Sequence, residues 1–287
     1  MAVDWTGESS CGPEWEVFVA GSLPLELLLR SARREVEDDD GDAAMPSLVA
    51  LQGRATREVF DRACALVVDP EVVLRELGVR ILRELGDEQP DGFRPFRGET
   101  VALMRARLAL EPDPGVVRWI VSALGWHRDR EALPEVVALA GHPDVRVRFH
   151  VAAALPGLVD RERVEPAAAE ALFRLCHDED ADIRYYALYA VTREIGGLDV
   201  EAVTALVVGL ADDADEQVRA MAVAHREAIG VVRELLDGVV EPGRRERLIG
   251  PVLVELAWAE DDADLLEDLI TDSDLAERLV RWWAGRD

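Results

Sequence analysis

Histidine and cysteine, which most often bind metals or act as nucleophiles, are few and scattered in this sequence. The histidines are His127, His142, His150, His177 and His225, and the cysteines are Cys11, Cys64 and Cys176. They form no HExxH motif, no CxxC pair and no histidine pair four residues apart. GxSxG and GxGxxG motifs are also absent. We therefore expect no metal site, no cofactor and no catalytic residue.

Aromatic side chains in the middle of the chain offer recognition in place of catalysis. Aromatic rings bury a large area at low entropic cost when a partner binds. The candidate partner surface consists of Trp119, Trp126, His127, His150, Tyr186 and Tyr189. The competing interpretation is that Trp119 and Tyr189 fill gaps between helical layers.

An aliphatic residue followed by Arg recurs along the chain. The copies end at Arg75, Arg148, Arg184 and Arg219, with steps of 73, 36 and 35 residues. Because 73 is about twice the shorter step, one more copy should lie in between. That copy is at Arg118, 43 residues after Arg75 and 30 before Arg148, one residue short in register. Steps near 35 residues are typical of stacked helical pairs.

Each repeated Arg is predicted to lie on an amphipathic helix. Three residues after it come Gly78, Val151, Ala187 and Ala222, and seven after it come Leu82, Leu155, Val191 and, breaking the pattern, Arg226. Such spacing defines one helical face, and small residues there permit close packing. Second helices are predicted over 99–110, 133–140, 164–176 and 200–210. Further helices are predicted over 23–36 and 56–68 before the array and over 244–260, 265–270 and 275–284 after it.

Composition favours a helical protein that does not bind phosphates. The chain is 49% hydrophobic and 6% aromatic, and its 58 acidic and 32 basic residues give a net charge of −26. Such a charge repels nucleic acids and anionic lipids, so a nucleic-acid partner is disfavoured. No Lys or Asn occurs, which excludes Schiff-base and P-loop chemistry. Without a membrane span or signal segment, we expect no membrane association and a cytoplasmic location.

Acidic residues gather in short runs. The run at 35–42 is interpreted as a solvated linker. The runs at 178–182, 212–216 and 260–264 precede predicted helices, so they would line one edge of a repeat array. They are either solvated capping turns or an acidic edge that a protein with a basic surface could follow.

Two stretches carry a family resemblance: GHPDVRVRF at 141–149 and DIRYYALYA at 182–190. They resemble the bacterial HEAT-repeat proteins that share the short helical pair of phycobilin lyases, over roughly 47–229. LQGRATREVF at 51–60 looks like the first helix of that family. The resemblance implies an all-α protein, an α-solenoid of about five HEAT-like helical pairs with capping helices at both ends. The expected parts are an N-terminal cap and acidic linker (1–45), the array (46–230) and closing helices (231–287).

The resemblance also implies a structural ladder built from Arg75, Arg148, Arg184 and Arg219. Each Arg would pair with an acidic residue of an adjacent unit. The expected partners are Asp178 or Asp144 for Arg184 and Asp212 or Asp213 for Arg219.

The leading functional hypothesis is a non-catalytic scaffold or adaptor that holds a protein partner along the groove of the solenoid. Alternatives are a HEAT-like alkylpurine DNA glycosylase, an enzyme similar to the bilin lyases, and an acidic mimic of nucleic acid. The sequence leaves the partner and the oligomeric state open.

Overall fold

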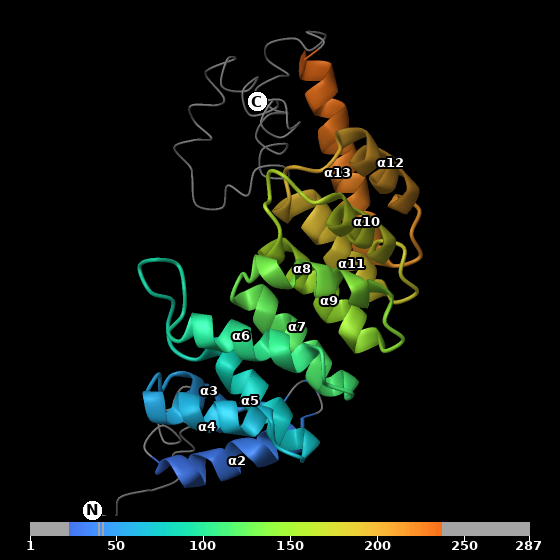
Figure 1. The fold of residues 1–287 in the computed structure, drawn as a ribbon. Helices are drawn as coiled ribbons and strands as arrows, with labels where there is room; N and C mark the ends of the chain where they lie inside the picture. Colours follow the sequence, from blue (N-terminus) through green and yellow to red (C-terminus); the bar gives the residue numbers. More distant parts are fainter. Residues whose placement is uncertain (1–22, 40, 42, 237–287) are drawn as a thin grey trace, which may run out of the picture. The chain divides into compact units, whose positions relative to one another are not determined.

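The computed structural model describes residues 23–39, 41 and 43–236, and all regular secondary structure in these ranges is helical (Figure 1). The predicted all-α solenoid is confirmed. The chain divides after Asp129 into two compact units, unit 1 up to Asp129 and unit 2 from Arg130. The predicted closing helices over 244–260, 265–270 and 275–284 lie outside the described residues.

Unit 1 contains six described helices, drawn from blue to green in Figure 1. They are α2 (Leu25–Glu37), α3 (Pro46–Gln52), α4 (Arg57–Val67), α5 (Val72–Glu84), α6 (Arg97–Leu108) and α7 (Pro114–Trp126). Helix α4 packs on α5 and α6 packs on α7, while α5 and α7 also contact each other. The helices that carry the repeated Arg motif therefore form one layer, which we call the Arg layer. The helices that precede them form the other.

Unit 2 repeats this arrangement. Its α-helices are α8 (Leu133–Ala138), α9 (Val145–Leu158), α10 (Pro166–Leu175), α11 (Ala181–Tyr189), α12 (Val200–Leu210) and α13 (Glu216–Leu236). Short 3₁₀ turns, η1 (Arg130–Ala132) and η2 (Leu139–Gly141), flank α8, and a π-helical turn, η3 (Ala190–Glu194), ends α11. Helix α11 packs against both α9 and α13. Described helices of the two units thus make five consecutive pairs, from α4–α5 to α12–α13.

Aspartates start the helices of the Arg layer. Asp113 accepts the backbone N–H groups of Gly115 and Val116 at the start of α7, at 2.9 and 3.2 Å. Asp144 accepts the N–H of Arg146 at 2.9 Å in the same way. The hydrogen bond from the Arg146 side chain lowers the pKa of Asp144 to about 2. These caps satisfy N–H groups that the first helical turn leaves without partners.

Gly78 brings α5 unusually close to α4, as the spacing rule predicts. A β-carbon at Gly78 would lie 2.7 Å from the backbone nitrogen of Val67 and 2.8 Å from the carbonyl oxygen of Ala63. No larger residue fits there without moving one of the helices. The small residue in the repeat is therefore required by packing.

The acidic run at 35–42 is not the solvated linker that the sequence suggests. Glu35, near the end of α2, accepts the backbone N–H groups of Ser47 and Leu48 and caps α3. Asp39 bonds the guanidinium of Arg80 at 2.7 Å, and both side chains are largely buried. Two carboxylates of the run therefore hold α3 and α5 in place, and the prediction of a purely solvated segment was wrong.

The stretch at 51–60 is also arranged differently from the expected single helix. Helix α3 ends at Gln52, and α4 begins after its N-cap Thr56, whose side chain accepts the N–H of Val59. Gln52 instead bonds the carbonyl oxygen of Arg80 on α5 at 2.9 Å. Only residues 53–56 separate the two helices, so the interruption is short.

Candidate functional site

In unit 2, the repeated Arg links the turns that start successive helices of its layer. Arg148 on α9 donates through Nη1 to the carbonyl oxygens of His142 and Pro143, in the turn before its own helix, at 3.0 and 3.3 Å. Through Nε and Nη2 it bonds both carboxylate oxygens of Asp178, in the turn before α11, at 2.7 and 3.0 Å. One guanidinium thus joins two consecutive turns.

Arg184 on α11 repeats this geometry one step further. Its Nη1 donates to the carbonyl oxygen of Asp178 at 3.0 Å. Its Nε and Nη2 bond the carboxylate of Asp213, before α13, at 3.0 and 2.8 Å. Asp178 therefore serves two arginines, through its carboxylate for Arg148 and through its backbone for Arg184. The contacts form a continuous ladder.

The ladder carboxylates are further fixed by the backbone of their own turns. Asp178 accepts the N–H of Asp180 at 3.0 Å, and Asp213 accepts the N–H of Asp215 at 2.8 Å. The Arg184 guanidinium holds the pKa of Asp213 below its ordinary value. Paired charges with every donor and acceptor satisfied make a rigid connection between repeats.

The carboxylates that were expected to pair with Arg184 and Arg219 were wrong. Arg184 takes the carboxylate of the following turn, because the Asp178 carboxylate already bonds Arg148. Arg219 donates to the backbone carbonyl of Asp213 at 2.6 Å, and neither the carboxylate of Asp213 nor that of Asp212 pairs with it among the described residues.

Unit 1 contains the most buried rung. Arg75 on α5 bonds both carboxylate oxygens of Glu111 at 2.9 Å, and the two side chains are 7% and 0% exposed. Arg107 donates to the same carboxylate at 2.7 Å. Burial alone would raise the pKa of Glu111, but the hydrogen bonds from Arg75 and Arg107 hold it below its ordinary value.

Helix α7 departs from the ladder by one residue. In α9 and α11 the ladder Arg lies four residues after the capping aspartate, and the same position in α7 is Val117, which is buried. The Arg of α7 comes one residue later, at 118, where its side chain leaves the ladder face. Its Nη2 lies 3.7 Å from a carboxylate oxygen of Glu76 on α5.

At this position Arg118 lies against Trp119, which belongs to a group of arginines and tryptophans on α5, α7 and the loop after α5. We name the group of six residues the Arg–Trp cluster; its members are Arg80 and Arg83 of α5, Arg94 of the following loop, and Arg118, Trp119 and Trp126 of α7. The guanidinium carbons of all four arginines lie 4.4–5.7 Å from the centroid of a tryptophan ring. At such distances a cation is attracted to the face of the ring.

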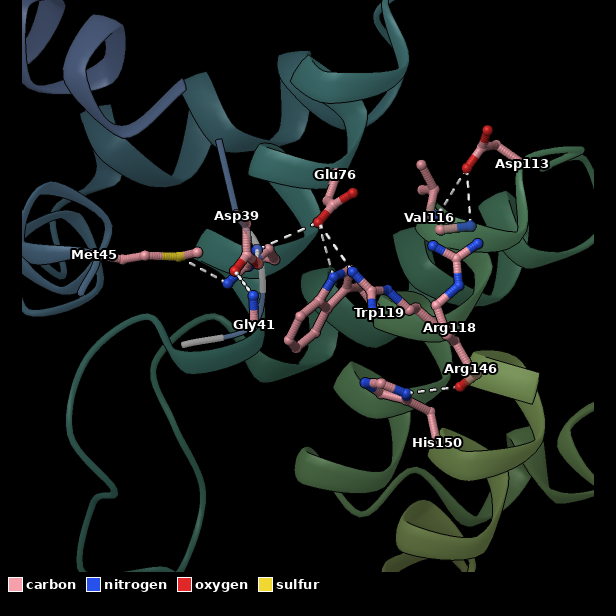
Figure 2. A network of polar contacts seen from close by, with 12 residues as sticks. Asp39, Gly41, Met45, Glu76, Asp113, Val116, Arg118, Trp119, Arg146 and His150 are labelled. Atoms are coloured by element: carbon pink, nitrogen blue, oxygen red, sulfur yellow. Dashed lines mark hydrogen bonds and ion pairs between the residues drawn. The ribbon is translucent and has the colours of Figure 1, made fainter. Parts of the chain in front are cut away.

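Trp119 is held on its polar side by Glu76. Its ring nitrogen donates to the Glu76 carboxylate at 2.9 Å, as Figure 2 shows. The same oxygen lies 3.3 Å from Arg80 and 3.7 Å from Arg118. Trp119 is half-buried, so it serves packing as well as presenting part of its ring.

Among the described residues of unit 1, Trp126 is the most exposed aromatic residue, with 49% of its surface accessible. The guanidinium carbon of Arg83 lies 4.5 Å and that of Arg94 lies 5.7 Å from its ring centroid. Arg94 donates to the carbonyl oxygens of Glu84 and Gly86 and has no carboxylate partner among the described residues. Trp126 and Arg94 therefore offer an aromatic face and a cation together.

Arg83 is a largely buried cation, with its side chain 21% exposed. It donates to the hydroxyl of Ser122 at 2.9 Å and contacts the carboxylate of Glu84. Burial, with the charges of Arg80 and Arg94, nevertheless lowers the pKa of Arg83 to about 10. The contact with the Glu84 carboxylate therefore does not compensate for burial and for the positive charges near Arg83.

His127 does not belong to a surface. It is only 3% exposed, and its Nε2 donates to the carbonyl oxygen of Leu82 at 3.0 Å. Burial lowers its pKa, and the charges of Arg97, Arg94 and Arg83 add to the effect. Its neighbour Trp126 is exposed because successive helical residues point about 100° apart. His127 therefore packs in the core and leaves the candidate surface.

Unit 2 presents an uncharged aromatic face on α9 and α11. Phe149 and Tyr186 make an edge contact with ring centroids 4.7 Å apart, and the His150 ring lies 5.4 Å from that of Phe149. The His150 ring nitrogen Nδ1 donates to the carbonyl oxygen of Arg146 on α9. Tyr186 and Tyr189 are 43% and 37% exposed. We call Phe149, His150, Tyr186 and Tyr189 the aromatic face.

The two described cysteines are not activated as nucleophiles. Burial raises the pKa of the Cys64 thiol to about 11 and raises that of Cys176 still further. Within the part of the chain that the structure describes, no group of three or more His, Cys, Asp or Glu residues could hold a metal ion. Within the same part, none of the helices is both long and apolar enough to cross a membrane.

The acidic runs at 178–182 and 212–216 contribute different carboxylates to different tasks. Asp178 and Asp213 belong to the ladder, and Asp180 and Asp215 cap α11 and α13. Glu179 also bonds Arg148, at 3.2 Å, but its side chain is 88% exposed. The run at 260–264 lies outside the described residues.

The comparisons with known proteins agree with this architecture. The family model of HEAT repeats matches residues 101–191, which span α7 to α11. The X-ray structure of the Escherichia coli protein YibA is similar with a TM-score of 0.58 and 16% sequence identity, covering 99% of this chain and all of that one. A search of curated proteins gave no significant match.

The chain therefore carries HEAT repeats in an α-solenoid, and its resemblance to bacterial HEAT-repeat proteins is confirmed. Repeats of this class are helical scaffolds that generally mediate protein interactions and are typically non-catalytic. The similarity to YibA, at 16% identity, shows the fold alone.

Proposed function

We propose that the chain is a non-catalytic scaffold that binds a protein partner through the aromatic residues of α7, α9 and α11. The observation that carries this proposal is the exposure of Trp126, Tyr186 and Tyr189 at 49%, 43% and 37%. All three lie on helices of the Arg layer. In unit 2 the ladder holds α9 and α11 in place without using the aromatic rings.

Large exposed aromatic side chains are unusual on a surface that only contacts water. Scattered apolar residues are common on any protein, but rings gathered on successive helices mark interaction sites. In unit 2, Tyr186 contacts Phe149, and both lie in the same layer as His150. Such a group can be desolvated by a partner at little conformational cost.

The charge of the chain supports a protein partner over a nucleic acid or a membrane. A net charge of −26 repels polyanions over the range of the Debye length. The exposed carboxylates of the capping turns, such as Glu179, favour a partner with some basic residues along that edge. We also propose a cytoplasmic location, because the described cysteines Cys64 and Cys176 are free thiols.

The test is partner capture by the full chain and by matched variants. Trp126→Ala and Tyr186→Ala each remove one exposed ring. Val208→Ala in α12 and Leu110→Ala after α6 remove side chains that are 52% and 73% exposed but lie outside the Arg layer. We expect a protein retained by the wild-type chain and by the two controls to bind the aromatic variants at least tenfold more weakly.

Circular dichroism of every variant would show that the helices persist. A partner whose affinity is unchanged by both aromatic variants, or equally reduced by the controls, would overturn the proposal.

A further inference from the structure

The Arg–Trp cluster is a concentration of positive charge in a strongly acidic chain. Four guanidinium groups touch the two tryptophan rings, and the carboxylates that contact these arginines are Asp39, Glu76 and Glu84. Asp39 bonds Arg80, and Glu76 lies near Arg80 and Arg118. The negative charge is thus concentrated at the Trp119 end of the cluster, and Arg94 at the other end has backbone partners only.

The Trp126 end therefore combines three features that recognise one kind of ligand. Arg94 has donors directed to two carbonyl oxygens and no carboxylate partner among the described residues. Arg83 lies between the two rings, at 4.5 Å from Trp126 and 5.7 Å from Trp119. About half of the Trp126 surface remains open.

We propose that the Trp126 end of the cluster binds an acidic peptide segment of a partner protein, with a Glu or Asp carboxylate bonded by Arg83 and Arg94. A neighbouring apolar or aromatic residue of that segment packs on the open face of Trp126. The inference rests on the proposed protein-binding function and names the chemistry of the partner at this site.

Charge decides between a carboxylate and a polyanion. Burial, and after it the charges of Arg80 and Arg94, disfavour the Arg83 cation and lower its pKa to about 10, so a single bound carboxylate next to it would stabilise it. A nucleic acid would bring many phosphates into a chain whose net charge is −26, and only part of the cluster lacks carboxylate contacts. The cluster is therefore suited to one or two negative charges next to an apolar group.

The one-residue shift in α7 explains why this site occurs in unit 1. Had the Arg of α7 remained at the ladder position, now Val117, its guanidinium would point to the turns as Arg148 does. At position 118 it lies over Trp119, 5.2 Å from the ring centroid, and contacts Glu76. Glu76 thereby serves Arg118 and Arg80. Beside Trp126, Arg83 contacts Glu84, and Arg94 has no carboxylate partner among the described residues.

The experiment measures peptide binding by the full chain with nuclear magnetic resonance of the tryptophan ring N–H groups. The probe is a short peptide in which Glu alternates with Leu and Phe. Its matched counterpart carries Gln at every Glu position, and a short oligothymidylate tests the competing class of ligand. We expect the acidic peptide to shift the signal of Trp126, and the Gln peptide to bind at least tenfold more weakly.

Two variants and one control test which arginines bind the carboxylate of the peptide. Arg94→Gln, in the loop before α6, should weaken binding of the acidic peptide about tenfold with the fold intact, and Arg83→Lys should weaken it less because the charge is kept. Arg62→Gln on α4 removes an exposed cation paired with Glu26, far in sequence from the rings, and should leave binding unchanged.

Several results would overturn the inference. They are equal binding of the Glu and Gln peptides, no binding of the acidic peptide, no effect of Arg94→Gln, or tighter binding of the oligothymidylate at the same ring signals. Partner capture that depends on Tyr186 and not on Arg94 or Trp126 would sink this inference and leave the proposed function standing. Capture that depends on none of the three would end both.

Discussion

In unit 2, Arg148 and Arg184 are engaged with backbone carbonyls and with Asp178 and Asp213, whereas the aromatic face consists of other residues, on the same two helices. In unit 1, Arg75 plays the ladder role, but four other arginines surround tryptophan rings. The same residue type thus stabilises the repeats in one setting and prepares a surface in the other. Position relative to the helix cap decides which.

The comparison has a structural reason. Four residues after the capping aspartate, an Arg side chain points back to the turns, where carbonyl oxygens and the carboxylate of the next turn accept its hydrogen bonds. One residue later the helix has turned by about 100°, and the side chain points along the exposed side of the layer. A shift of a single residue therefore moves an Arg from the ladder to the Arg–Trp cluster.

Among the ladder residues, we expect substitution of Glu111 to have the largest effect on stability. Glu111→Ala leaves Arg75 and Arg107 without their shared, fully buried carboxylate, so we expect a loss of about 3–5 kcal/mol in the free energy of unfolding. Glu179→Ala is the control: this carboxylate also pairs with a ladder arginine, Arg148, but is 88% exposed, so its loss should change stability by less than about 0.5 kcal/mol. Urea denaturation followed by circular dichroism measures both; equal effects would contradict the structural role of the rung.

Acid should weaken both units through one buried histidine in each. Burial lowers the pKa of His225 to about 4 and also lowers that of His127, from an unfolded value of 6.5. Because the folded pKa is the lower one, the unfolded chain binds more protons below pH 6.5, and stability is lost as the pH falls. We expect a loss on the order of 2–3 kcal/mol between pH 7 and pH 4.5.

His225→Gln removes one of the two titrating groups and is the matched variant for this prediction. The decline in its denaturation midpoint between pH 7 and pH 4.5 should be shallower than in the wild type. An identical decline would show that His225 does not titrate in this way.

Helix packing in the two units differs at the glycines. Gly78→Ala in α5 would place a β-carbon 2.7 Å from the Val67 nitrogen, and we expect it to destabilise the chain by about 1–3 kcal/mol. Gly209→Ala in α12 meets no atom within 4 Å and should stabilise by up to about 1 kcal/mol. Thermal denaturation of the two variants checks the opposite signs; a neutral Gly78→Ala would refute the close contact.

The smallest expected change in stability distinguishes the helix-capping aspartate from the ladder aspartate in the turn before α11. Asp180→Ala removes the cap that accepts the N–H groups of Asp182 and Ile183 and should lower stability by about 1 kcal/mol. Asp178→Ala, two residues earlier, removes the carboxylate of Arg148 and should lower it more. The reverse order in urea midpoints would mean that these aspartates are assigned to the wrong roles.

Repeat spacing predicted much of the fold. The helix expected over 200–210 is α12 with those same bounds, and Gly78 has the close contact that its place in the pattern requires. Periodicity works here because each helix must bury one face against its neighbours. It did not reveal α3, because seven residues are too few to show a helical period, nor the capping role of Glu35 in the acidic run.

The candidate site was predictable only in its aromatic half. Trp126, Tyr186 and Tyr189 are exposed as the helical pattern suggests, but His127 is buried because it follows Trp126 by one residue at the end of α7. The two cations beside Trp126 are Arg83 of α5 and Arg94 of the loop after it, 43 and 32 residues before the ring. Nothing in the local sequence links them to the ring. The available signal was the one-residue shift at Arg118, whose meaning required the ladder geometry.

The central claim, that the rings of the Arg layer are the binding surface, is tested most directly by hydroxyl-radical footprinting of the chain with and without its captured partner. The account predicts that the partner protects Trp126, Tyr186 and Tyr189 while Leu110 and Val208, which are also exposed, react as before. Protection of Leu110 or Val208 with unchanged reactivity of the three rings would contradict it.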